Sequence, residues 1–312
     1  MLKDLLETKK CFKLVCGAGN EDAAEVEWLT YIYAKAGCRF FDLNASPEIV
    51  AAAKRGLKSA GADDAYLCVS VGIKGDPHVS KAVIDFDKCI GCGQCDEICP
   101  QGAIRYHKVK RQRCIGCGRC AKVCPKKAIS YISEPKELSE ILPPLIEMGI
   151  DCIELHAMNG AGDEIKRNWD FIKNNFSGML SICTSRGELS DRGLIELVKE
   201  MIDGLEPYRV IVQADGFPMS GGKDDYKTTL QAVATAEIVQ NAKLPVYIML
   251  SGGTNSKTAE LAKMCGIEYH GIAVGSYARK IVGKSNFGND FPTIGNSFNE
   301  SLNTAKELVE TV

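Results

Sequence analysis

The sequence predicts an α/β fold, a TIM-like (β/α)8 barrel with a ferredoxin-like 2[4Fe-4S] module inserted after its third strand. Eight short apolar runs alternate with helical patterns, which is typical of parallel strands joined by helices. A duplicated cysteine motif interrupts this alternation between the third and fourth runs. Without residues 81–132, 260 of the 312 residues remain, which is close to the usual size of such a barrel.

The apolar runs have the length and composition of buried parallel strands. They are expected at 12–16, 40–44, 65–71, 152–157, 179–184, 209–215, 246–251 and 271–275. Helical patterns are expected at 21–36, 47–59, 135–148, 163–175, 191–203, 226–241, 257–265 and 298–310. An open, doubly wound sheet is the competing fold, because the same alternation would also build it. The barrel domain should comprise residues 1–80 plus 133–312, and the inserted domain residues 81–132.

Two identical cysteine runs, each spaced C-x2-C-x2-C-x3-C-P, stand 25 residues apart. The same offset relates Tyr106 to Tyr131, so the whole unit is duplicated. Three closely spaced thiolates hold three irons of one cubane, and the fourth cysteine reaches the other cluster. The sequence therefore predicts two [4Fe-4S] clusters, and structural zinc sites are the less favoured alternative. Cys89, Cys92, Cys95 and Cys124 are assigned to the first cluster, and Cys99, Cys114, Cys117 and Cys120 to the second.

Charge and hydropathy exclude several classes of protein. A net charge of −2 gives no electrostatic basis for non-specific nucleic-acid binding. No apolar run of about 18 residues is present, so no membrane insertion is expected. The first residues carry charges where a signal peptide needs an apolar stretch, which indicates a cytoplasmic protein. Residues 85–133 carry 10 Lys and Arg against 4 Asp and Glu, which suits either charge compensation of the clusters or an acidic redox partner protein.

Polar residues recur at a spacing of two near the ends of three predicted strands. The pairs are Asp42 and Asn44, Glu154 and His156, and Gln213 and Asp215. Alternate residues share one strand face, so these side chains are expected to point into the barrel. A self-satisfied polar layer is one interpretation, and a substrate or cofactor site is the other. His156 is the best candidate for proton transfer, with Glu154 and Asp215 as the further catalytic candidates.

Two glycine-rich stretches, at 251–255 and 274–280, follow the seventh and eighth predicted strands. Barrels commonly bind phosphate groups at these loops, although simple tight turns are the alternative. The candidate cofactor-binding residues are Gly252, Gly253, Thr254, Gly275, Ser276 and Arg279. FMN, or another phosphate-bearing ligand, is the expected occupant. The stretch 213–225, with Phe217 and Met219, is expected to cover the mouth as a lid.

The combination of these motifs is specific. FKLVCGAGNED, the duplicated cysteine motif, QADGFPMSG, and LSGGTN followed by GSYARK resemble the light dependent period protein family, over most of residues 11–282. That family comprises cyanobacterial iron–sulfur proteins that act as redox-linked inputs to the circadian clock. The resemblance implies two clusters on the eight cysteines and a redox-sensing or electron-transfer role. Both cluster motifs are regular here and the chain is shorter at its C-terminus, so a circadian role does not carry over.

Three functions remain in competition. The first is a redox protein that passes single electrons between the clusters and a site at the barrel mouth. In its enzyme form, the barrel holds a phosphate-bearing cofactor, FMN above all, or a phosphorylated substrate. The second is a redox sensor that signals the state of the clusters to a protein partner without catalysis. The third is an electron carrier whose barrel is only a scaffold.

Overall fold

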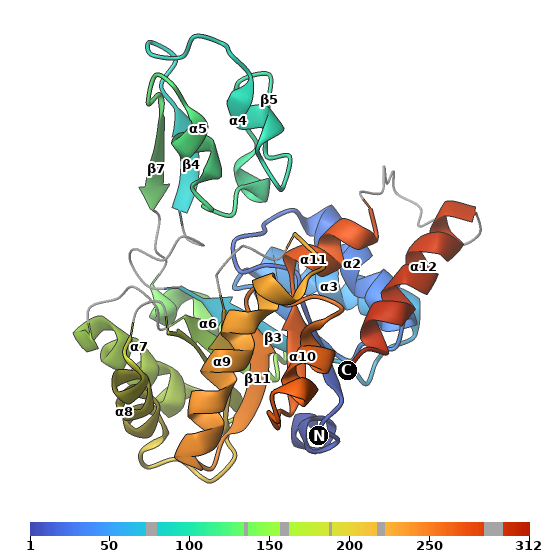
Figure 1. Cartoon of the computed structure of the whole chain (residues 1–312), viewed down its shortest axis with the longest axis vertical. Helices are drawn as coiled ribbons and strands as arrows, with labels where there is room; N and C mark the ends of the chain where they lie inside the picture. The colour runs from blue at the N-terminus through green and yellow to red at the C-terminus, as the bar shows by residue number, and fades with distance from the viewer. Residues whose placement is uncertain (73–79, 134–136, 157–161, 187–188, 217–221, 284–295) are drawn as a thin grey trace.

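The computed structural model describes residues 1–72, 80–133, 137–156, 162–186, 189–216, 222–283 and 296–312 (Figure 1). Eight parallel strands close into a barrel in the order β1-β12-β11-β10-β9-β8-β3-β2. They are β1 (Cys11–Val15), β2 (Phe40–Asn44), β3 (Tyr66–Val71), β8 (Cys152–His156), β9 (Met179–Ser185), β10 (Val210–Asp215), β11 (Tyr247–Ser251) and β12 (Gly271–Val274). Because β1 pairs with both β2 and β12, the sheet has no free edge. The predicted barrel is confirmed, and the open sheet is wrong.

Helices surround the barrel and bury an apolar face against the outer side of the strands. They are α2 (Ala23–Lys35), α3 (Pro47–Ala60), α6 (Leu138–Glu147), α7 (Gly162–Asn175), α8 (Asp191–Ile202), α9 (Tyr226–Ala242), α10 (Thr258–Met264), α11 (Ser276–Ile281) and α12 (Asn296–Val309). The structure adds α1 (Leu2–Glu7) and α11 to the predicted helices. Both have six residues, which is too short for a helical period to show in the sequence.

The short helix α1 lies at the end of the barrel opposite the inserted module (Figure 1). Its side chains close that end. Leu2 and Leu6 are buried there against inward-facing residues of the strands, including Phe40 and Cys68. An apolar layer therefore fills this end of the barrel. The polar inward-facing residues lie toward the other end, where the strands finish.

The inserted module follows β3 and stands at the carboxyl end of the strands, as predicted (Figure 1). Its outer strands, β4 (Ser80–Ile84) and β7 (Ile129–Ser133), form an antiparallel pair. Between them lie α4 (Gln94–Glu97), the hairpin of β5 (Ile104–Arg105) and β6 (Lys108–Val109), a 3-10 turn at Arg111–Arg113, and α5 (Arg119–Val123). The module buries a small core of its own, in which cysteines pack with short apolar side chains.

Gly56 allows α2 and α3 to pack closely. A Cβ atom at this position would overlap the Thr30 hydroxyl and the Glu27 carbonyl oxygen of α2. Glycine inside a helix costs about 1 kcal/mol relative to alanine, so its presence in α3 indicates a steric requirement. The contact fixes the pair of helices that follow β1 and β2.

We expect Gly56→Ala to destabilise the protein by about 2 kcal/mol, because the overlap outweighs the better helix propensity of alanine. Urea unfolding followed by far-UV circular dichroism measures the change. Gly162→Ala, at the start of α7, is the matched control because its Cβ would meet no atom within 4 Å. Equal unfolding midpoints for Gly56→Ala and the wild type would contradict the steric explanation.

Candidate functional site

The duplicated loops bring the eight cysteines together in two groups of four. Cys89, Cys92, Cys95 and Cys124 line one hollow of the module, and Cys99, Cys114, Cys117 and Cys120 line another. Each group takes three cysteines from one run and one from the other, which is the arrangement that the spacing predicts for two cubanes. Among the described residues, no three His, Cys, Asp or Glu side chains are placed to hold a single metal ion. The combination of three cysteines from one run with one from the other favours cubane clusters over zinc ions.

Glycines and backbone amides shape both groups in the same way. Gly93 and Gly118 precede α4 and α5 with φ angles of 77° and 76°, a conformation that side chains disfavour. Each turn places the third cysteine of its run at the start of a short helix. The amide of Ala103 donates to Cys99 Sγ at 3.2 Å, and the amide of Ala128 donates to Cys124 Sγ at 3.3 Å. Such bonds stabilise the thiolate charge and tune cluster potentials.

The second cysteine group lies on the side of the module that contacts the barrel. Lys81 is buried, and its ammonium donates to the Gly19 carbonyl at 2.8 Å and to the Cys114 carbonyl at 3.0 Å. Burial lowers the pKa of Lys81, although the carboxylate of Glu21 opposes this effect. Arg113 Nε also donates to Asp22 Oδ2 at 2.6 Å. The segment after β1 is thereby attached to the loop that carries Cys114.

Ile115, directly after Cys114, lines two hollows at once. It forms part of the second cysteine hollow and part of the hollow at the barrel mouth. One apolar side chain therefore stands between the two sites. Neither Lys81 nor Ile115 was among the predicted site residues, because both act through contacts between segments far apart in the sequence.

The mouth of the barrel contains a hollow of about 750 Å³, a volume that includes open solvent. It opens at the carboxyl ends of the strands, where barrel enzymes bind their substrates. The structure brings all the candidate catalytic and cofactor-binding residues to its wall, whereas Asn44, also predicted to face into the barrel, does not line the hollow. The candidates at the wall are His156, Glu154, Asp215, Gly252, Gly253, Thr254, Gly275, Ser276 and Arg279.

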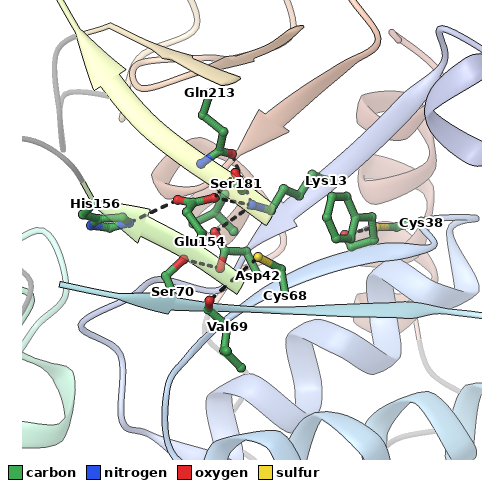
Figure 2. Close-up of polar contacts among 12 residues, drawn as sticks. Lys13, Cys38, Asp42, Cys68, Val69, Ser70, Glu154, His156, Ser181 and Gln213 are labelled. Carbon is green, nitrogen blue, oxygen red and sulfur yellow. Dashed lines mark hydrogen bonds and ion pairs between the residues drawn. The ribbon is translucent and has the colours of Figure 1, made fainter. Parts of the chain in front are cut away.

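A buried lysine that sequence reasoning missed lies at the centre of the polar layer (Figure 2). Lys13 Nζ lies 2.7 Å from Glu154 Oε2, and 3.2 Å from both Asp42 Oδ2 and Gln213 Oε1. Its side chain has no exposed surface. His156 Nε2 lies 3.1 Å from Glu154 Oε1 and extends the network toward the mouth. The signal in the sequence was a lone lysine inside the apolar run FKLVC.

The surroundings of Glu154 and Asp215 shift the pKa values of the two carboxyl groups in opposite directions. Burial acts to raise the pKa of Glu154, but Lys13 and His156 outweigh it and hold this pKa at about 2. Burial raises the pKa of Asp215, although hydrogen bonds with Ser251 and Cys183 oppose the rise. Glu154 is thus held ionised beside His156, whereas Asp215 retains a proton more readily. Pairs of groups with separated pKa values are typical of acid–base sites.

The two glycine-rich loops form the part of the wall next to Asp215. Gly252 and Gly253 have φ angles of 67° and 80°, and a Cβ at Gly252 would lie 2.6 Å from Asp215 Oδ1. Arg279 donates through Nη1 to the Val15 carbonyl at 2.9 Å. Its Nε is buried and has no hydrogen-bond partner in the described part of the chain. Arg279, which lines the mouth, thus keeps one unpaired donor.

The hydroxyl of Thr254 is less available than the sequence suggests. Thr254 Oγ1 donates to the Ala273 carbonyl at 2.5 Å, so its proton is already used. Ser276 Oγ accepts from Arg279 Nη2 at 3.4 Å and keeps its own proton for another acceptor. Phe217 and Met219, predicted to form a lid, lie outside the described residues.

Replacing Lys13 with methionine should destabilise the protein by about 3–5 kcal/mol near neutral pH, because Asp42 and Glu154 lose their buried cation. In the wild type, Glu154 stabilises the fold above its unfolded pKa of 4.5, and this contribution is lost as the pH falls toward 2. In the variant the unpaired carboxyl groups take up protons on folding, so the difference in stability should shrink as the pH falls toward their unfolded pKa values of 3.8 and 4.5.

Thermal unfolding at several pH values measures this difference, while visible absorbance monitors the clusters. Lys166→Met is the control, because the Lys166–Glu200 pair is exposed and its loss should change stability by less than about 1 kcal/mol. A pH-independent deficit in Lys13→Met would contradict the assigned charges.

Solved structures share the fold at low sequence identity. A mutant tryptophan synthase α-subunit from Pyrococcus furiosus matches with a TM-score of 0.50 and 9% identity, over 97% of this chain and 98% of that chain. The tryptophan synthase α-chain from Legionella pneumophila gives a TM-score of 0.46 and 12% identity, over 99% and 96% of the two chains. Such likeness concerns the fold alone. In the described part of the chain, no helix has the length and apolar character needed to cross a membrane.

Sequence comparison is more specific. Residues 82–133 match the 4Fe-4S dicluster domain, which supports two [4Fe-4S] clusters and implies electron transfer. Residues 144–311 match the light dependent period A C-terminal domain. Light dependent period A from Synechococcus elongatus is 33% identical over 296 residues, covering 88% of this chain and 82% of that protein. The chain therefore belongs to the light dependent period A family.

Proposed function

We propose that the protein is an iron–sulfur oxidoreductase that passes single electrons between its two clusters and a phosphate-bearing ligand at the barrel mouth. The observation that carries this proposal is the position of Ile115, which lines both the second cysteine hollow and the mouth. When bound, the clusters supply and accept single electrons. A site that shares a wall with a cluster is well placed to exchange electrons with it.

The residues of the module hold the clusters and fix their position. The eight cysteines form two groups with the composition that cubanes require, and backbone amides donate to Cys99 and Cys124. Lys81 binds the carbonyl oxygens of Gly19 and Cys114 and so keeps the second group against the barrel. Ile115 contributes apolar surface to the separating wall and limits water between the two sites.

The mouth offers different chemistry on its two sides. The free Arg279 Nε and the close backbone at Gly252 suit a phosphate group. On the other side, His156 can give a proton to the ligand or take one from it, since Glu154 holds it from behind. A ligand that carries a phosphate at one end and a proton-coupled redox group at the other fits both sides. FMN is the cofactor that best matches this description.

A redox partner protein would exchange electrons at the first cysteine group. Cys92 is exposed, and Ile90, which lines the same hollow, has an exposed fraction of 60%. Residues 85–133 carry a net charge of +6, so the module attracts an acidic partner. The partner contact and the barrel contact are then on different halves of the duplicated unit.

Protein purified without oxygen is expected to release a flavin on acid precipitation, or to bind added FMN with quenching of its fluorescence. Arg279→Gln should weaken FMN binding by about tenfold or more, because a buried hydrogen bond to a charged group is lost. Lys280→Gln is the matched control, since this neighbouring lysine is exposed and donates to the Gly222 carbonyl. Iron analysis and circular dichroism check that both variants fold and carry their clusters.

Protein with about eight irons per chain that binds neither FMN nor inorganic phosphate would contradict the proposal. The redox-sensor alternative would then be favoured, and it predicts capture of a partner that depends on the redox state. An anaerobic crystal structure soaked with FMN gives a second readout. Density away from Gly252 and Arg279 would also contradict the assigned site.

Docking of an acidic partner is tested by charge reversal near the first cysteine group. Lys126 is exposed and lines that hollow, so Lys126→Glu should slow cluster reduction by an acidic carrier such as flavodoxin by about fivefold at low salt. The salt dependence of the rate should also become shallower. Lys199→Glu, on the exposed face of α8, is the control and should leave the rate unchanged. Equal rates for all three proteins would place the partner elsewhere.

A further inference from the structure

Tyr131 makes a direct contact with the second cysteine group. Its phenol oxygen lies 3.1 Å from Cys120 Sγ. Tyr131 lies on β7 opposite Ala82 of β4, and the amide of Ala82 donates to Cys114 Sγ at 3.3 Å. The two-stranded sheet of the module therefore presents two donors to thiols of the same group, one from a side chain and one from the backbone.

The chemistry of the site fixes the direction of the Tyr131 bond. A cysteine that ligates iron has no proton, so Cys120 can only accept. The phenol of Tyr131 has one O–H to donate, and its oxygen lies within hydrogen-bond distance of Cys120 Sγ. Tyr131 must then donate its O–H to the thiolate of Cys120. Hydrogen bonds from such donors to anionic acceptors are stronger than those between neutral groups.

The duplicated half lacks this contact. Tyr106 is the counterpart of Tyr131 at the 25-residue offset, and Cys95 is the counterpart of Cys120. The side chain of Tyr106 is 86% exposed, so its phenol faces solvent. The reason lies in the backbone: β5 ends at Arg105, and Tyr106 and His107 form the turn to β6 with φ angles of 49° and 61°. β7 continues for five residues and carries Tyr131 over the second group.

We infer that Tyr131 raises the reduction potential of the second cluster through its hydrogen bond to Cys120. Reduction adds negative charge that the thiolates share, and a donor on a thiolate stabilises that charge. The two halves of the duplicated motif thus hold clusters with unequal potentials. If the proposed function holds, the donor favours the electron on the cluster beside the barrel mouth. The effect on the potential requires the two clusters but no ligand in the barrel.

Redox titration of the full-length protein, followed by electron paramagnetic resonance without FMN, tests this inference. In Tyr131→Phe, one of the two cluster potentials should shift to a more negative value and the other should stay unchanged. Tyr106→Phe is the matched control from the other half and should change neither potential. Iron content, expected at about eight per chain in each variant, shows that both clusters are loaded.

A second substitution protects the test against a purely structural effect. Replacing Tyr131 with 3-fluorotyrosine keeps the shape of the ring and makes the phenol a stronger donor, so the same potential should move in the positive direction. Unchanged potentials in both Tyr131 variants, or equal shifts in Tyr106→Phe, would overturn the inference. Because no barrel ligand takes part, either result leaves the FMN test of the proposed function separate.

Discussion

The buried ammonium of Lys81 is the interaction on which the relation between the two domains depends. It joins the Gly19 carbonyl, in the loop after β1, to the Cys114 carbonyl in the second cysteine run. A buried cation is costly unless it is paired, and two carbonyl oxygens with the nearby Glu21 carboxylate meet that need. The loop that shapes the barrel mouth and the loop that holds the second cluster therefore move together. Ile115 becomes a shared wall because of this attachment.

The polar layer of the barrel depends on a similar compensation. Lys13 faces the carboxyl groups of both Asp42 and Glu154, and one ammonium cannot balance two ionised carboxylates. Burial raises the pKa of Asp42 despite the attraction of Lys13, whereas Glu154 remains ionised. The charges of this polar layer therefore do not fully balance one another, although its side chains are buried. Its bonds to Lys13 fix Glu154, and Glu154 holds His156 at the surface of the mouth.

Local patterns predicted much of this arrangement, and long-range contacts explain what they missed. Strand parity placed Glu154 and Asp215 in the mouth because alternate residues of a strand share a face. The same parity applies to Lys13, but nothing local shows which acidic residues on other strands will surround a lysine. Ile115 is an ordinary apolar residue in its own segment, and only the packing of the module on the barrel gives it two neighbouring sites. Cysteine spacing was sufficient to predict the two ligand groups, because both lie within one short duplicated unit.

Insertion after β3 explains why the two halves of that unit differ. The loop after a barrel strand opens at the carboxyl end, so a module placed there meets the mouth with one side. The other side then faces solvent, and equivalent positions of the repeat meet unequal surroundings. Tyr131 is on the strand that pairs with β4, next to the barrel attachment at Lys81, whereas its counterpart Tyr106 lies in an exposed turn. The topology of the insertion thus distinguishes a barrel-side cluster from a solvent-side cluster, although the sequence spacing of their ligands is identical.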